Sequence, residues 1–175
     1  MALYLHEITP AVREPGEVEA LIKSVDTVVR DAGGSLIETQ VTEGAAKLFV
    51  ITEFSDSQAA NTADLATLEA TAVVGPDEVR LVGAELDQVK AARPTAGYLV
   101  EWDIPAEIDM DTYFARKKAN APKYADVPEV SFLRTYVRED TDKCLCFYDA
   151  PDEAAVLRAR DAVSTPVDRL HRLQG

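Results

Sequence analysis

The chain contains 175 residues, of which 47% are hydrophobic, and this is enough to form one domain core or two small ones. Its 31 acidic residues exceed its 18 basic residues and give a formal net charge of −13. This charge repels polyanions, so we expect neither nucleic acids nor membranes as partners, whereas cations and neutral or cationic small molecules remain open. No apolar run approaches the roughly 18 residues of a membrane-spanning helix, and residues 1–7 lack the features of a signal peptide. We therefore expect a cytoplasmic protein.

The first half of the chain predicts four strands and two helices. Residues 16–34 carry apolar side chains at helical spacing and end on two glycines, which predicts a helix. Residues 55–72 begin with possible capping residues and are rich in Ala and Leu, which predicts a second helix. Runs of apolar and β-branched residues predict strands at 2–9, 35–42, 46–54 and 78–83.

The second half shows the same order of elements. A helix is predicted after Asp109, and another at Pro151, where a proline followed by acidic residues is typical of a first helical turn. Each half therefore reads strand, helix, strand, strand, helix, strand, which is the order of the ferredoxin-like split motif. The strands of this half are predicted near 97–103, 130–137, 143–149 and 167–172.

The two halves also share sequence. The segment "YLHEITPAV" from Tyr4 aligns with "YLVEWDIPAEI" from Tyr98, and "KLFVITEFSD" from Lys47 aligns with "KCLCFYDAPD" from Lys143. Similar segments in the same order indicate a tandem repeat.

The repeat sets the predicted domains and fold class. We predict an α+β protein of two tandem ferredoxin-like units, at residues 1–88 and 96–175, joined by a junction at 87–97. A sheet with helices on one face leaves the other face bare, so we expect the units to pack sheet to sheet as a single-chain dimeric α/β barrel. The protein would then be a monomeric pseudo-dimer or a homodimer of such chains.

The second half resembles a known family. The segments "YLVEWDIPAE", "VSFLRTYVREDTDKCLCFYDAPDEAAV" and "TPVDRL" are similar to small bacterial ferredoxin-like proteins that long carried only a domain-of-unknown-function label. One member of that family is described as a homodimeric nickel-binding protein. The resemblance implies the fold and a dimer-like architecture, and it implies nickel or another divalent transition metal as a cofactor.

Cys144 and Cys146 are the only cysteines, and the period of a strand places both on one face. They could ligate a metal, although two further ligands would be needed. The aligned residues of the first half are Leu48 and Val50, so the position also suits small buried apolar side chains, a role that free cysteine fills.

His6 aligns with Val100, so a titratable side chain stands where the second half has an apolar one. It could be a buried hydrogen-bonded residue, a metal ligand or a general base. His171 lies close to the end of the chain, where we expect an exposed side chain.

Glu7 and Glu101 occupy equivalent central positions, and a half-buried carboxylate needs a partner. The natural partners are Arg80 and Arg169 on the last strand of each unit, but a role in a pocket also remains open. Tyr98 and Tyr148 could line such a pocket or belong to the core. We interpret the one basic cluster, which contains Arg116, Lys117, Lys118 and Lys123, as the solvated side of a helix.

Three functions remain open. The first is a binding protein that holds a nickel-like ion or a small ligand, with His6, Glu101, Cys144 and Cys146 as candidate metal ligands. The second is a cofactor-independent isomerase, cyclase or monooxygenase for a small hydrophobic substrate, with His6 or Glu101 as base and Tyr98 or Tyr148 as hydrogen-bond donor. The third is an interaction module without a small-molecule site, which an exposed apolar patch would indicate.

Overall fold

The computed structural model describes residues 1–92 and 96–174, so the middle of the predicted junction lies outside the described residues. The chain divides into two compact units. The first comprises Met1–Val79, Asp87–Arg93 and Gln174, and the second comprises Arg80–Leu86 and Pro94–Leu173. The segment before the junction is therefore shared between the units, whereas the sequence suggested a single cut.

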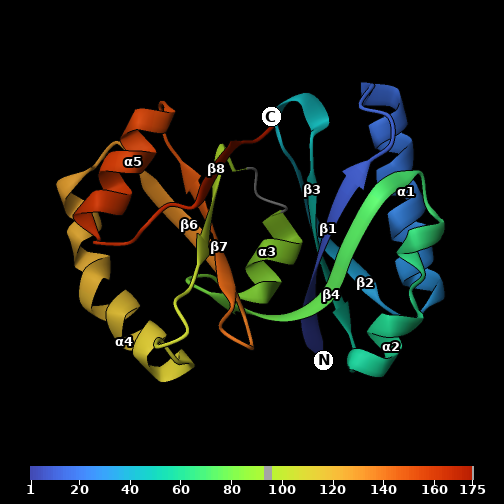
Figure 1. Ribbon diagram of the computed structural model, residues 1–175, viewed down its shortest axis with the longest axis horizontal. Helices are drawn as coiled ribbons and strands as arrows, with labels where there is room; N and C mark the ends of the chain where they lie inside the picture. Colours follow the sequence, from blue (N-terminus) through green and yellow to red (C-terminus); the bar gives the residue numbers. More distant parts are fainter. Residues whose placement is uncertain (93–95, 175) are drawn as a thin grey trace. The chain divides into compact units, whose positions relative to one another are not determined.

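The first unit contains a four-stranded antiparallel sheet (Figure 1). Its elements are β1 (Ala2–Pro10), α1 (Pro15–Asp31), β2 (Ser35–Val41), η1 (Glu43–Ala45), β3 (Leu48–Phe54), α2 (Ser57–Thr62), η2 (Leu65–Thr67) and β4 (Ala70–Val82), and α3 (Leu86–Ala92) follows. β1 pairs with both β3 and β4, while β2 pairs with β3. This order, β2-β3-β1-β4, is that of a ferredoxin-like unit.

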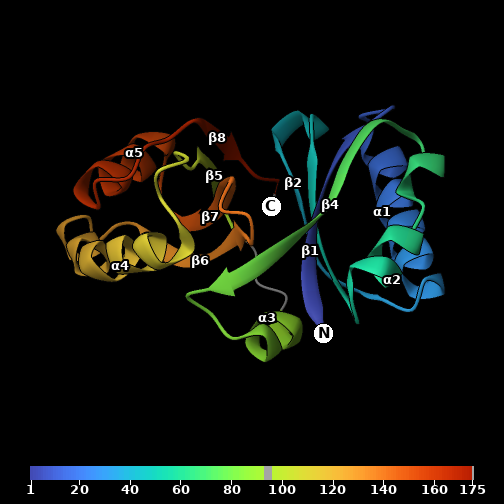
Figure 2. The same ribbon diagram turned by 60° about the horizontal axis from the view of Figure 1, so that its bottom comes forward.

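Helices α1 and α2 lie on one face of this sheet (Figure 2). The predicted helix at 16–34 is confirmed as α1, because its apolar stripe is buried against the strands. The stripe consists of Val18, Leu21, Val25 and Val29.

The predicted helix at 55–72 is wrong over its second half. α2 ends at Thr62, and residues from Ala70 onward already belong to β4. Composition favoured a helix, but the segment from Ala70 to Val74 pairs with the end of β1, and its β-branched side chains suit a strand. Tertiary pairing therefore overrides the local preference of the Ala-rich stretch.

The second unit repeats the arrangement. Its elements after β4 and α3 are β5 (Tyr98–Asp103), α4 (Met110–Asn120), η3 (Ala121–Asp126), β6 (Ser131–Arg138), β7 (Lys143–Asp149), α5 (Glu153–Ala162) and β8 (Arg169–Arg172). β5 pairs with β7 and β8, and β6 pairs with β7. Both predicted helix starts are confirmed, since Asp109 accepts from the backbone of Thr112 and Asp152 accepts from that of Ala155.

All eight strands follow one antiparallel hydrogen-bonded order, β2-β3-β1-β4-β6-β7-β5-β8. The predicted α+β class and the ferredoxin-like order of the strands are thus confirmed. The tandem origin of the halves and their packing as a single-chain barrel stay predictions. No described helix is both long and apolar enough to cross a membrane.

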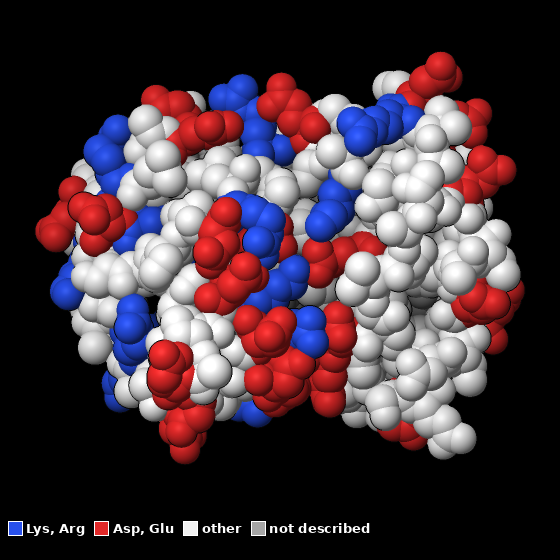
Figure 3. Space-filling model, viewed as in Figure 1, with Lys and Arg blue, Asp and Glu red and all other residues white. Residues whose placement is uncertain are grey.

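Charge is distributed unevenly over the surface (Figure 3). Lys and Arg alternate with Asp and Glu over the second unit, whereas the surface over α2 and the start of β4 is mostly uncharged. Residues 57–76 accordingly contain Asp64 and Glu69 as their only charged side chains. The net charge of the chain therefore does not describe its local environments.

Candidate functional site

A cavity of about 380 Å³ lies in the second unit, between the sheet and helices α4, η3 and α5. The strands contribute Trp102, Cys144 and Cys146, all on the face that the helices cover. The other apolar and aromatic side chains of the wall are Val82, Tyr113, Phe114, Tyr124, Phe132 and Val163. A mainly aromatic cavity of this size is typical of a small-molecule site.

Gly83 forms part of this wall directly after β4. Its φ of +88° lies in the left-handed region, and a Cβ atom there would stand 2.7 Å from the ring of Phe132. Glycine therefore lets this segment approach the cavity closely.

The charged lining of the cavity is basic. The four charged residues are Arg116, Lys117, Lys118 and Arg160, and no described lining residue is Asp or Glu. In a chain with a net charge of −13, an all-basic lining is a local reversal of sign. It produces a positive potential that favours an anion.

The interpretation of the basic cluster as a solvated helix side is wrong for two of its members. Lys118 is exposed as predicted, but Arg116 and Lys117 are half-buried. The guanidinium of Arg116 lies 5.4 Å from the ring centroid of Trp102, and the Lys117 ammonium lies 4.5 Å from that of Phe132. The aromatic wall thus holds both cations beside the cavity.

Arg160 is the most deeply buried of the four cations, with 2% of its surface exposed. Its Nη1 donates to the Tyr148 hydroxyl at 3.1 Å and its Nη2 to the Pro166 carbonyl at 2.6 Å. Its Nε has no hydrogen-bond partner, and no carboxylate among the described residues pairs with it. Burial lowers the pKa of Arg160, but the neighbouring Cys146 and Tyr148 raise this pKa by more than burial lowers it. The net shift is upward, so the guanidinium stays charged.

Two tyrosine hydroxyls extend this polar wall. The oxygens of Tyr124 and Tyr148 lie 2.6 Å apart. Since Arg160 donates to the Tyr148 oxygen, the Tyr148 proton is free to point to Tyr124, and the Tyr124 proton can then be donated into the cavity. Burial raises the pKa of Tyr124 to about 12 and that of Tyr148 well above its ordinary value, so both remain neutral donors.

The two thiols of β7 lie side by side in the cavity wall. Their sulfur atoms are 3.9 Å apart, and the Thr135 hydroxyl donates to Cys146 Sγ at 3.3 Å. The hydrogen bond with Cys144 lowers the pKa of Cys146 against the effect of burial, and the charges of Lys117 and Arg160 act in the same direction. The same bond, together with burial, raises the pKa of Cys144. The cysteines thus combine a place in the core with access to the cavity.

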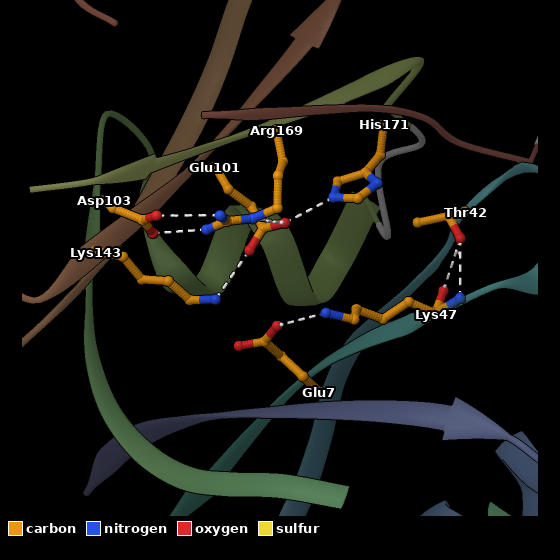
Figure 4. Close-up of polar contacts among 8 residues, drawn as sticks. All are labelled: Glu7, Thr42, Lys47, Glu101, Asp103, Lys143, Arg169 and His171. Carbon is orange, nitrogen blue, oxygen red and sulfur yellow. Dashed lines mark hydrogen bonds and ion pairs between the residues drawn. The ribbon is translucent and has the colours of Figure 1, made fainter. Parts of the chain in front are cut away.

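Glu101 forms an ion cluster on the opposite face of the sheet (Figure 4). Its carboxylate accepts from Lys143 Nζ at 2.9 Å, from Arg169 Nε at 2.9 Å and from His171 Nε2 at 2.7 Å. Burial raises the pKa of Glu101, but the bonds from His171, Lys143 and Arg169 outweigh it and hold the pKa well below its ordinary range. Arg169 also holds Asp103 through two bonds, of 2.6 and 3.0 Å.

These contacts identify the partners of the two glutamates, Glu101 and Glu7. The predicted pair of Glu101 with Arg169 is confirmed, and His171 is half-buried against Glu101 instead of exposed. Glu7 pairs with Lys47 at 3.2 Å, while Arg80 binds Glu139. Lys47, which directly precedes β3, thus reaches a carboxylate of the neighbouring strand β1.

His6 lies in the first unit, beside a second cavity of about 360 Å³. Its Nε2 is 2.9 Å from the Thr52 hydroxyl, and burial lowers its pKa to about 4. Two polar side chains, Asn61 and Asp64, share the lining of this cavity. At neutral pH the imidazole is therefore uncharged.

The structure brings only part of the candidate set together. Cys144 and Cys146 line the cavity of the second unit, and Tyr148 reaches it through Tyr124 and Arg160. Glu101 faces away from that cavity, and the hydroxyl of Tyr98 accepts from Arg172 at 3.2 Å. Among the described residues, no three His, Cys, Asp or Glu side chains form a group that could hold a metal ion.

Sequence reasoning missed Arg160, Lys117 and Tyr124. A signal for Arg160 was available, because it lies on the buried stripe of α5 together with Ala155, Val156 and Ala159. A cation at an apolar position of a helix indicates a buried partner or a ligand. The sequence holds no comparable signal for Lys117, because its place in the cavity wall follows from the folded unit.

Residues 98–173 match the family described as nickel responsive protein SCO4226-like. The match covers less than half of the chain and lies within the second unit, where it supports the resemblance noted from the sequence. No curated protein matches the chain.

The fold of the whole chain is similar to several solved structures. A protein described as "putative chlorite dismutase" is 12% identical with a TM-score of 0.58, covering 100% of this chain and 96% of that one. A "putative monooxygenase" from Lactobacillus acidophilus NCFM is 12% identical with a TM-score of 0.55, covering 99% and 94%. A second, from Fusobacterium nucleatum subsp. nucleatum ATCC 25586, is 14% identical with a TM-score of 0.51, covering 98% and 90%. At these identities the likeness shows the fold alone.

Glu101→Ala is expected to lower the free energy of unfolding at pH 7 by about 3–5 kcal/mol, because it removes the buried carboxylate that accepts from Lys143, Arg169 and His171. The pKa of Glu101 is depressed in the folded state, so its contribution is present above the unfolded pKa of about 4.3 and is lost as the pH falls below it. Urea denaturation measures both effects. The control Glu129→Ala removes an exposed pair with Arg158, which solvent screens, and should cost far less. Equal losses for the two variants would contradict this role.

The variant His6→Val gives the first half the valine that the second half has at the aligned position, Val100. Because burial lowers the pKa of His6 to about 4, the unfolded chain binds a proton that the folded chain does not between pH 6.5 and 4. Stability is therefore complete above pH 6.5 and should fall on acidification, by as much as about 3 kcal/mol at pH 4. Denaturation series across this range should show a shallower slope for His6→Val than for the wild type. Parallel curves would show that His6 does not titrate this way.

Proposed function

We propose that the protein binds a small organic anion with an apolar body in the cavity of the second unit. The observation that carries this proposal is the charge of Arg160, which is buried at the cavity without a carboxylate partner. A buried charge without a carboxylate partner costs free energy in a folded protein, and a ligand of opposite sign would lower that cost.

The polar groups around Arg160 favour a planar acid group. The free Nε of Arg160 and the hydroxyl of Tyr124 can both donate to oxygen atoms, and Lys117 adds positive charge. These two donors suit a carboxylate, which presents two oxygens in one plane. The anion end of the ligand is therefore expected beside α5.

The rest of the cavity suits an aromatic or branched apolar body. Its volume of about 380 Å³ lies within the range of small-molecule sites, and its walls include Trp102, Phe114 and Phe132. Aromatic walls stabilise a flat ligand by burial and by stacking. The net charge led us to expect neutral or cationic ligands, but local charge determines what enters a site.

An enzymatic role is compatible with the same cavity. The fold likeness to proteins described as monooxygenases supports it only at the level of architecture. Of the four residues first considered for catalysis, Tyr148 alone reaches this cavity, as a neutral hydrogen-bond donor behind Tyr124. Binding is therefore the function that the geometry supports best.

Nickel binding is the second candidate, favoured by the family match and by the two thiols. The sulfur atoms of Cys144 and Cys146 are 3.9 Å apart, close to the roughly 3.8 Å between two thiolates on one tetrahedral ion. The described residues offer no third His, Cys, Asp or Glu for this position, so the site is incomplete for nickel. The described residues thus supply two ligands for a metal ion and lack the others that a complete site requires.

Calorimetric titration with Ni²⁺ tests the second candidate. An incomplete ligand set predicts at most weak binding, and Cys146→Ser should abolish it. Stoichiometric binding at micromolar nickel that survives in the Cys144→Ser/Cys146→Ser variant would contradict this expectation and would place the metal elsewhere.

The anion proposal is tested with 2-naphthoate and its neutral analogue 2-naphthamide. We expect calorimetry to show at least about tenfold tighter binding of the acid to the wild type, because a charged hydrogen bond contributes roughly 1.5–3 kcal/mol. Arg160→Met should remove this preference. Circular dichroism verifies that the variant is folded, and Lys117→Met provides a second variant that should weaken the preference.

The matched control is Arg158→Met on the same helix. Arg158 is exposed and pairs with Glu129, away from the cavity, so the preference for the acid should persist. Equal binding of acid and amide by the wild type, or equal effects of Arg158→Met and Arg160→Met, would contradict the proposal.

A further inference from the structure

A line of polar contacts in the cavity wall ends on the sulfur of Cys146. Lys117 Nζ donates to Thr135 Oγ1 at 3.0 Å, and Thr135 Oγ1 donates to Cys146 Sγ at 3.3 Å. Because the lysine occupies an acceptor site of the hydroxyl, the proton of Thr135 is directed to the sulfur. Cys144 Sγ lies 3.9 Å from the same atom and can act as a second donor.

The first unit provides an internal comparison. Thr39 lies opposite Val50 in the pair β2–β3, as Thr135 lies opposite Cys146 in the pair β6–β7. The hydroxyl of Thr39 is buried without a hydrogen-bond partner. At this position the threonine hydroxyl therefore has a hydrogen-bond partner only in the second unit, where Cys146 stands in place of the valine.

The charges around Cys146 favour its ionised form. Lys117 and Arg160 line the same cavity, and no carboxylate among the described lining residues opposes them. A thiolate beside two cations and two hydrogen-bond donors is the arrangement of a reactive cysteine. Cys144, which donates to the pair, is the less nucleophilic of the two.

We propose that Cys146 is a nucleophile that adds covalently to α,β-unsaturated carbonyl compounds entering this cavity. The inference rests on the proposed function, because it assigns a reactive group to the wall of the same binding site. It adds a chemical requirement to the ligand, namely an electrophilic alkene conjugated to a carbonyl group on the apolar body.

The step is a conjugate addition. The sulfur of Cys146 forms a bond to the β-carbon, the π electrons of the alkene move toward the carbonyl, and its oxygen becomes an enolate. Arg160 and Lys117 provide positive charge for this oxygen within the cavity. A proton from solvent, equal to the one that the thiol lost, is then added to the α-carbon. No oxidant or reductant is required.

The test uses N-ethylmaleimide, a small neutral electrophile of this class, with the folded full-length protein. Intact-mass spectrometry and peptide mapping are expected to show one adduct, on Cys146. Cys146→Ser should abolish the reaction in the folded state, and Cys144→Ser should retain it. Denatured wild type, which exposes both thiols, provides the positive control with two adducts.

The reaction rate at one fixed pH distinguishes a nucleophile supported by its neighbours from a merely accessible thiol. At pH 7, Thr135→Val should slow the reaction of Cys146 by about tenfold, because it removes a hydrogen-bond donor to the sulfur. The matched variant Thr39→Val should leave the rate unchanged.

The outcomes separate this inference from the binding proposal. Tight binding of 2-naphthoate without any adduct on the folded protein would overturn the inference and leave the binding proposal intact. An adduct on Cys144, or a rate that Thr135→Val leaves unchanged, would also overturn it. An adduct on Cys146 that forms more slowly in Thr135→Val would support it, even if 2-naphthoate and 2-naphthamide bind equally and the anion proposal fails.

Discussion

The alternation of side chains along the paired strands β5 and β7 is the constraint on which the chemistry of the second unit depends. Val100 lies opposite Cys146 and Trp102 opposite Cys144, and all four face the helices. The intervening residues of the same strands face the other way, so Glu101 and its cationic partners lie on the opposite side of the sheet. The pleat thus keeps the buried carboxylate away from the cavity. For that reason Glu101 pairs with Lys143, Arg169 and His171 and not with Arg160.

Most of the fold could be predicted because its signals are local. The apolar stripe of α1 and the caps Asp109 and Asp152 lie within a few residues of the elements that they define. The failure at residues 55–72 has a non-local cause. Whether an Ala-rich stretch continues as a helix or turns into β4 depends on the free edge of β1, which no short window contains.

The site was predictable where the repeat supplied a register. The alignment identified His6 against Val100 and Tyr148 against Thr52 as the main differences between the halves. His6 lines the cavity of the first unit, and Tyr148 bonds to Tyr124 and Arg160 in the wall of the other cavity. The cationic lining was not predictable in the same way. A lysine or arginine in a sequence can pair with any acid that the fold brings to it, and Arg160 matters because none of the described acidic side chains pairs with it. Whether a cationic side chain lacks an acidic partner can be seen only when the positions of all its neighbours are known.

The strand β4 shows that the boundary between the two similar halves of the sequence differs from the boundary between the two compact units of the structure. The last residues of β4 and the following Gly83 belong to the second unit, although they precede the linker between the repeats. Val82 and Gly83 also line the cavity. A fragment beginning at Ala96 would therefore contain the strands β5 to β8 and still lack one wall of the cavity. The cavity is completed only by the continuous polypeptide.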